Sequence, residues 1–151
     1  MTRFLCDAML GKLATYLRMC GHDTAYALDR DEESADALLD WAREEERRLL
    51  TRNERLAERA PDAVLLRAHD PTDQLAELRA AGVALALPEA PVRCSTCNGR
   101  VRRVGEDERR PEGVPPADER PVWQCVDCGQ FYWRGSHWAD LRETLSSLGT
   151  D

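Results

Sequence analysis

The first 90 residues alternate between short apolar runs and longer segments in which apolar positions follow a helical period. The pattern predicts a strand at residues 3–6 and then a helix at residues 9–21, with one apolar face. That face consists of Leu10, Leu13, Ala14 and Leu17. The same patterns predict further strands at 24–28, 49–51, 63–67 and 83–87, and further helices at 35–46, 54–59 and 70–82. Strands that alternate with helices in this way predict an α/β fold, with a parallel sheet covered on both faces.

The composition changes at Pro88-Glu89-Ala90-Pro91, which predicts an α/β domain at residues 1–90 and a second unit at residues 91–151. The second unit contains two CxxC pairs flanked by apolar residues that read as the short strands of a ribbon. Residues 105–121, between the pairs, are charged and proline-rich, which predicts a mobile loop. Residues 137–148 carry apolar positions typical of a short helix.

The two CxxC pairs predict a structural zinc site with four thiolate ligands, because zinc favours tetrahedral sulfur coordination and the chain shows no secretion signal. The ligands are Cys94, Cys97, Cys125 and Cys128. A redox dithiol and an iron–sulfur cluster are the alternatives, and neither needs the ribbon-like flanks. The remaining two cysteines, Cys6 and Cys20, lie in apolar stretches and are expected to be small core residues.

The charge balance argues against binding nucleic acid through a broad basic surface, because the net charge is −7 and the isoelectric point is about 5.0. An acidic, metal-dependent nuclease site remains compatible with it. Residues 91–136 hold eight basic and seven acidic side chains, so the ribbon is the likelier electrostatic contact for RNA. Its arginines, including Arg100, Arg102 and Arg103, alternate with aromatic residues. This pattern is typical of a surface that binds single-stranded nucleic acid, but solvated arginines over core aromatics would give the same pattern. Charge near the N-terminus and the lack of a long apolar run predict a soluble, cytoplasmic protein without a membrane span.

Acidic and amide side chains follow the predicted strands at the points where the strands end, except that Asp36 lies near the start of a predicted helix. They are Asp7, Asp29, Asp31, Asp36, Asn53 and Asp70. Because the carboxyl ends of parallel strands meet at one edge of a sheet, these groups are expected to gather there, where Mg²⁺ or Mn²⁺ would offset their charge. Such a site can activate water for attack on a phosphodiester. Spacing alone leaves open a phosphatase site, or helix caps and a solvated loop without chemistry.

Several motifs in order along the chain resemble a PIN-like ribonuclease family, the one named after the C-terminal domain of the Mut-seven exonuclease. They are Phe4-Leu5-Cys6-Asp7-Ala8-Met9-Leu10-Gly11-Lys12-Leu13-Ala14, Tyr16-Leu17-Arg18, Gly21-His22-Asp23, Ala42-Arg43-Glu44-Glu45, Leu49-Leu50-Thr51-Arg52-Asn53, the two CxxC pairs, and Tyr132-Trp133-Arg134-Gly135-Ser136-His137-Trp138. The resemblance covers nearly the whole chain. It implies a PIN-like α/β domain, a zinc ribbon and a metal-dependent ribonuclease.

The resemblance also implies roles for particular residues. Asp7 matches the first metal-binding carboxylate, the acidic helix-start position falls near Asp36, and Asn53 stands where the family usually shows Asp. Lys12 and Arg52 are expected to contact phosphates. The main alternative is an adaptor that binds RNA or a protein partner without catalysis, which Asn53 and the net charge favour. A toxin-like component neutralised by a partner protein is a third hypothesis.

Overall fold

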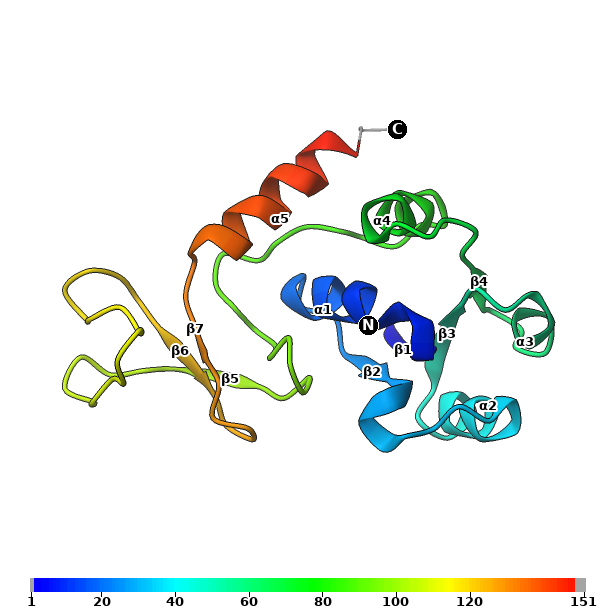
Figure 1. The fold of residues 1–151 in the computed structure, drawn as a ribbon, viewed down its shortest axis with the longest axis horizontal. Helices are drawn as coiled ribbons and strands as arrows, with labels where there is room; N and C mark the ends of the chain where they lie inside the picture. Colours follow the sequence, from blue (N-terminus) through cyan, green and yellow to red (C-terminus); the bar gives the residue numbers. More distant parts are fainter. Residues whose placement is uncertain (1, 149–151) are drawn as a thin grey trace.

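The structure, a computed structural model, describes residues 2–148 and confirms the predicted α/β class. Four parallel strands form one sheet in the order β2-β1-β3-β4 (Figure 1). Their bounds are β1 Arg3–Cys6, β2 Thr24–Tyr26, β3 Arg47–Thr51 and β4 Val64–Leu65. Strand β1 pairs with β2 on one side and β3 on the other, so the connection after β1 runs to one side of the sheet and the connection after β3 runs to the other. This reversal of strand order between β1 and β3 is where open α/β sheets usually bind ligands.

Helices cover both faces of the sheet because side chains along each strand alternate between two apolar clusters. The helices are α1 Gly11–Met19, α2 Ala35–Glu44, α3 Glu54–Glu58, α4 Pro71–Ala80 and α5 Ser136–Ser147. Phe4, Cys6 and Leu50 point into the cluster that α1, α4 and α5 complete. Leu5 and Leu49 point to the opposite face, where α2 and α3 cover them. The thiol of Cys6 is buried in the cluster that contains Phe4 and Leu50, and this burial raises its pKa to about 12.

A three-stranded antiparallel sheet forms the ribbon that was predicted around the CxxC pairs (Figure 1). Its strands, in the order β5-β6-β7, are β5 Val101–Arg103, β6 Trp123–Cys125 and β7 Phe131–Tyr132. The charged segment 105–121 between β5 and β6 forms turns and contains no helix or strand. Arg110 donates hydrogen bonds to the carbonyl oxygens of Pro115 and Arg120, which tie this segment together.

The prediction of a strand at residues 83–87 is wrong. Val83 and Leu85 are buried in the core as expected from the alternating pattern, but the segment pairs with no strand. Side chains, not a neighbouring strand, bond its backbone: His22 lies 2.7 Å from the carbonyl oxygen of Ala84, and Arg79 donates to that of Leu85. The alternating apolar pattern therefore indicated that this segment is extended and buried, but not whether it forms the backbone hydrogen bonds to a neighbouring strand that define a β-strand.

Several other predicted elements are shorter in the structure. The second strand ends at Tyr26, where the 3₁₀ turn Ala27–Arg30 begins, and the helix predicted to residue 46 ends at Glu44. Strand β4 ends at Leu65: the N–H of Leu66 still donates to the carbonyl oxygen of Thr51, but those of Arg67 and Ala68 donate to the carboxylate of Glu77 instead.

The first CxxC loop is bonded to the edge strand β2. Asn98 accepts a hydrogen bond from the backbone N–H of Thr24 and donates one to Asp23. Arg18, whose side chain is 3% exposed, donates to the carbonyl oxygens of both Ser95 and Thr96. The division at residue 90 stays a prediction, and α5 packs its Leu141 and Leu145 into the core formed by the first 85 residues. No helix within residues 2–148 combines the length and apolar character that a membrane crossing needs.

Candidate functional site

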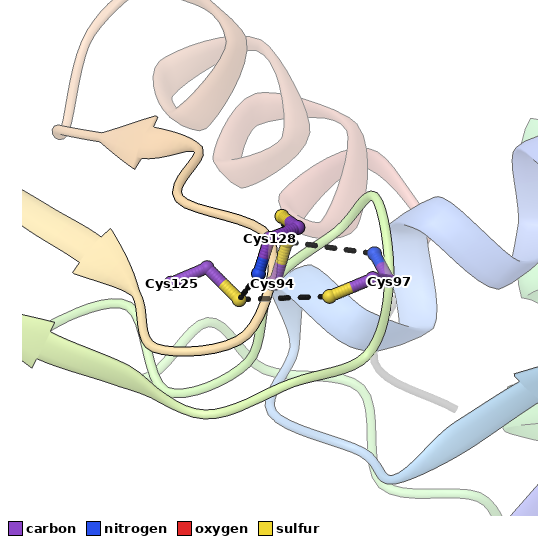
Figure 2. Close-up of side chains that lie close together, drawn as sticks. All are labelled: Cys94, Cys97, Cys125 and Cys128. Atoms are coloured by element: carbon purple, nitrogen blue, oxygen red, sulfur yellow. Dashed lines mark hydrogen bonds between the residues drawn. The ribbon is translucent and has the colours of Figure 1, made fainter.

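The four cysteine sulfurs converge from the two CxxC loops, and all lie within 4.8 Å of one another. The sulfurs of Cys94 and Cys128 are 3.6 Å apart and those of Cys97 and Cys125 are 3.5 Å apart. Figure 2 shows the four side chains close together. These separations are far longer than a disulfide bond of about 2.05 Å. Four sulfurs at about 2.3 Å from a tetrahedral zinc ion would lie about 3.8 Å apart, so the thiols fit zinc without rearrangement of the loops.

Hydrogen bonds favour the ionised form of one of the four cysteines, Cys94. Burial opposes the charge of Cys94, but hydrogen bonds from the Tyr132 hydroxyl and two backbone N–H groups outweigh it and lower its pKa to about 7. Burial raises the pKa of Cys97 to about 12, so without a cation the cluster would not hold four thiolates at neutral pH. Gly99 leaves room for this packing, because a Cβ there would lie 3.0 Å from the sulfur of Cys125. The cluster is therefore compatible with zinc binding.

Asp7 lies at the carboxyl end of β1, next to the end of β3, at the point where the strand order reverses. Its two carboxylate oxygens have different partners. Oδ2 accepts a hydrogen bond of 2.7 Å from the hydroxyl of Thr51, and Oδ1 accepts one of 2.7 Å from the backbone N–H of Ala8. These two bonds fix the orientation of a half-buried carboxylate at this edge.

Asn53 is joined to Asp7 through the same threonine. Its backbone N–H donates to the Thr51 hydroxyl at 3.0 Å, while that hydroxyl donates to Asp7. The side chain of Asn53 caps α3 by accepting from the backbone N–H of Leu56 at 3.2 Å. The structure thus brings two of the three predicted catalytic residues together, Asp7 and Asn53, with Thr51 between them.

The other acidic candidates have partners of their own. Asp36 is in the first turn of α2, its side chain is 81% exposed, and it pairs with Arg59 at 2.6 Å. Asp29 pairs with Arg18 at 3.0 Å, and Asp70 caps α4. Within residues 2–148, the four cysteines are the only group of three or more cysteine, histidine or acidic residues that is close enough to share an ion.

The basic residues predicted to bind RNA are divided between the two parts of the molecule. Lys12 is exposed on α1, with its ammonium 5.2 Å from the centre of the Tyr16 ring. Arg52 follows β3 and lies 2.9 Å from His69, which follows β4. On the ribbon, Arg100 is exposed, Arg102 pairs with Glu108 at 2.9 Å, and Arg103 stacks over Trp123.

Sequence reasoning did not identify Thr51 and Tyr132 as parts of these sites. Thr51 is fully buried in the third strand, where a threonine is usually read as a strand former. The sequence offered one indication of this role: Thr51 directly follows the apolar pair Leu49-Leu50 and lies two residues before Asn53. Tyr132 is one of the ribbon aromatics that the sequence predicts to form either a single-strand platform or a core, and its hydroxyl lies 2.9 Å from the sulfur of Cys94.

The comparisons agree with this arrangement. A family model described as the Mut7-C RNAse domain matches residues 2–145, which includes the Asp7 edge, the ribbon and most of α5. No curated protein and no solved structure gives a significant match to the chain. Because the match spans both the parallel sheet and the four-cysteine cluster, the chain belongs to the Mut7-C RNAse domain family.

Proposed function

We propose that this chain is a divalent-metal-dependent ribonuclease whose site lies at the carboxyl edge of the parallel sheet. One observation carries the proposal: Asp7 sits where the strand order reverses, with its carboxylate held by Thr51 and by the N–H of Ala8. Ligands of open α/β sheets bind at such a point. The family is that of an RNase domain, which supports RNA as the substrate class.

The oxygen donors at this edge suit Mg²⁺ or Mn²⁺. Mg²⁺ is commonly held by one or two carboxylates together with substrate phosphates, so Asp7 with the neighbouring Asn53 amide can supply the protein's share. A bound divalent cation would offset the phosphate charge that develops during hydrolysis and lower the pKa of a water molecule. Thr51 keeps the Asp7 carboxylate oriented, and the α3 cap keeps Asn53 at the same edge. Asp36 remains a predicted ligand, and it would have to leave Arg59 to take part.

The ribbon is proposed to hold structural zinc and to help dock RNA. Arg100, Arg102 and Arg103 lie on or next to β5, at the part of the chain whose net charge is positive. Arginine forms bidentate contacts with phosphate, and such contacts weaken as salt rises. Replacing the three arginines with alanine should weaken binding of single-stranded RNA more than it slows cleavage of bound RNA. An unchanged affinity would defeat this part of the proposal.

The experiment that tests the function is cleavage of a set of single-stranded and hairpin RNAs in Mn²⁺, in Mg²⁺ and after removal of free divalent metal. Zinc must stay bound in every sample, so a mild chelator with a zinc supplement is required. Cleavage that depends on Mn²⁺ or Mg²⁺ supports the proposal. Cleavage of no RNA in either metal would overturn it.

A second candidate function is an adaptor that binds RNA or a protein partner without cutting. Asn53 favours it, because an amide can ligate a metal through its carbonyl oxygen but carries no charge to hold one. An adaptor would bind zinc alone, whereas the nuclease must also bind a divalent ion at Asp7. Titration of the zinc-loaded chain with Mn²⁺ therefore separates the two functions.

A further inference from the structure

A groove of about 690 Å³ runs between α1, the ribbon and the first turns of α5. Its walls come from three segments that are far apart in the chain and that the fold brings together. From α1 come Lys12, Thr15, Tyr16 and Met19; from the ribbon, chiefly Phe131, Tyr132 and Trp133; from α5, chiefly Ser136, His137 and Asp140. The proposed metal site does not include this groove, although both lie beside α1.

The ribbon wall of the groove is a row of half-buried aromatic side chains at residues 131–133. Gly135 helps to place the last of them: a Cβ at this position would lie 2.8 Å from the indole nitrogen of Trp133, so only glycine lets the ring lie against the backbone. The hydroxyl of Tyr132 is engaged by the zinc site, where it bonds Cys94. Trp133 and Phe131 therefore provide the flat surfaces that a ligand in the groove can stack on.

The charge lining the groove differs in sign from that of the whole chain. Lys12 and Arg93 contribute two positive charges, of which Arg93 pairs with Asp23 at 3.7 Å, and Asp140 contributes one negative charge. Lys12, the only lysine in the sequence, forms no ion pair within residues 2–148. A cation without an acidic partner beside half-buried aromatic side chains suits a ligand that is anionic and carries flat rings, as a single-stranded nucleic acid does.

The groove has one lining residue, Lys12, that is close in sequence to the proposed site. It follows α1, and Lys12 lies near the N-terminal end of that helix, five residues after Asp7. The nine residues of α1 span about 13 Å, the length of about four stacked nucleotides. We propose that this groove binds a single-stranded RNA segment, with bases stacked on Trp133 and Phe131 and a phosphate at Lys12, and delivers the strand to the Asp7 edge. The proposal rests on the proposed function, since it names how the substrate reaches that site.

Binding is best measured without cleavage, on zinc-loaded full-length chain that carries Asp7→Asn. The probe is a short fluorescein-labelled RNA without self-complementarity, followed by fluorescence anisotropy at fixed salt, with an unlabelled RNA duplex as competitor. Trp133→Leu is expected to weaken binding by about 5-fold to 100-fold, the loss that removal of one stacked base produces. Trp133→Phe should restore most of the affinity because it restores an aromatic face. Gly135→Ala should weaken binding as well, since it displaces the indole without removing it.

Lys12→Ala is expected to weaken binding and to flatten its salt dependence, while Arg43→Ala, an exposed position on α2, serves as the matched control. Circular dichroism and zinc content establish that each variant is folded. If folded Trp133→Leu and Lys12→Ala bind the RNA as the parent does, the groove proposal is overturned, whether or not the chain cleaves RNA. Groove variants that lose binding in a chain that shows no cleavage would support the groove and overturn the nuclease. An absence of RNA binding by the parent chain would overturn the groove and point to a protein ligand.

Discussion

Arg18 links the first CxxC loop to the parallel sheet, and replacing it with methionine tests how strongly that link stabilises the fold. Its guanidinium is almost fully buried and reaches four acceptors. They are the carbonyl oxygens of Thr24 at 2.8 Å, Thr96 at 3.1 Å and Ser95 at 3.2 Å, and the carboxylate of Asp29 at 3.0 Å. Methionine keeps most of the apolar stem of the side chain and removes every donor.

The expected cost follows from how far water can replace each lost bond. The bond to Thr24 is buried, so its carbonyl oxygen loses a donor that water does not replace, at about 2 kcal/mol. The loop carbonyls of Ser95 and Thr96 are only partly buried, and Asp29 is 47% exposed, so these three bonds together add about 1 kcal/mol. Arg18→Met should therefore lower the free energy of unfolding by about 3 kcal/mol.

Urea unfolding of the zinc-loaded chain, followed by circular dichroism, measures this loss. Arg43→Met is the matched control: Arg43 is 77% exposed and pairs only with Asp40 on the same helix, so its replacement should change stability by about 0.5 kcal/mol at most. A loss of unfolding free energy below about 1 kcal/mol for Arg18→Met would refute the reasoning, because the bonds to the first CxxC loop would then contribute little to stability.

Three further predictions concern the metal sites and the acid stability. The chain should bind one zinc ion per molecule, and Cys97→Ser should lose most of this zinc while Cys20→Ser keeps it. A thiol-blocking titration before and after chelation measures the zinc content of both variants. Equal zinc content in the two variants would contradict the assignment. Asn53→Asp should keep the α3 cap and bind Mn²⁺ more tightly, because it adds a carboxylate beside Asp7, whereas Asn53→Ala should lose about 1 kcal/mol of stability; Mn²⁺ titration and urea unfolding test the pair. Burial opposes the charge of Asp23, but hydrogen bonds from Asn98 and Arg47 outweigh it and lower its pKa, so its stabilising contribution is present above its ordinary pKa of 3.8 and is lost as the pH falls through the lower folded value. Unfolding free energies of Asp23→Asn and parent should thus differ above this range and converge in acid, and a constant difference would count against the linkage.

The sequence was sufficient for the sheet, the ribbon and the four-cysteine cluster because each has a local signal. Apolar alternation and helical periodicity predicted all four strands of the parallel sheet, and the two CxxC pairs predicted a cluster whose sulfurs do meet. The strand predicted at residues 83–87 failed because burial and pairing give the same alternating pattern, and only the fold decides whether a partner strand is within reach.

The proposed metal site at the sheet edge was harder to predict because its members meet through tertiary contacts. Sequence order placed Asp7 and Asn53 at strand ends, but no local pattern indicated that the hydroxyl of Thr51 would join them. Nor did it indicate that Arg59 would pair with Asp36. The groove along α1 was equally hidden, since its walls come from segments more than 100 residues apart.

The most direct test of the central claim is the initial rate of RNA cleavage by the parent chain and by Asp7→Asn, in Mn²⁺ with zinc bound in both. Asp7 is the proposed metal-binding carboxylate, and the hydroxyl of Thr51 orients it. The account therefore predicts that the cleavage rate falls by at least about 100-fold in the variant. Both proteins should give the same zinc content and circular dichroism. Equal rates in the two folded proteins would contradict the account and show that any cleavage arises elsewhere.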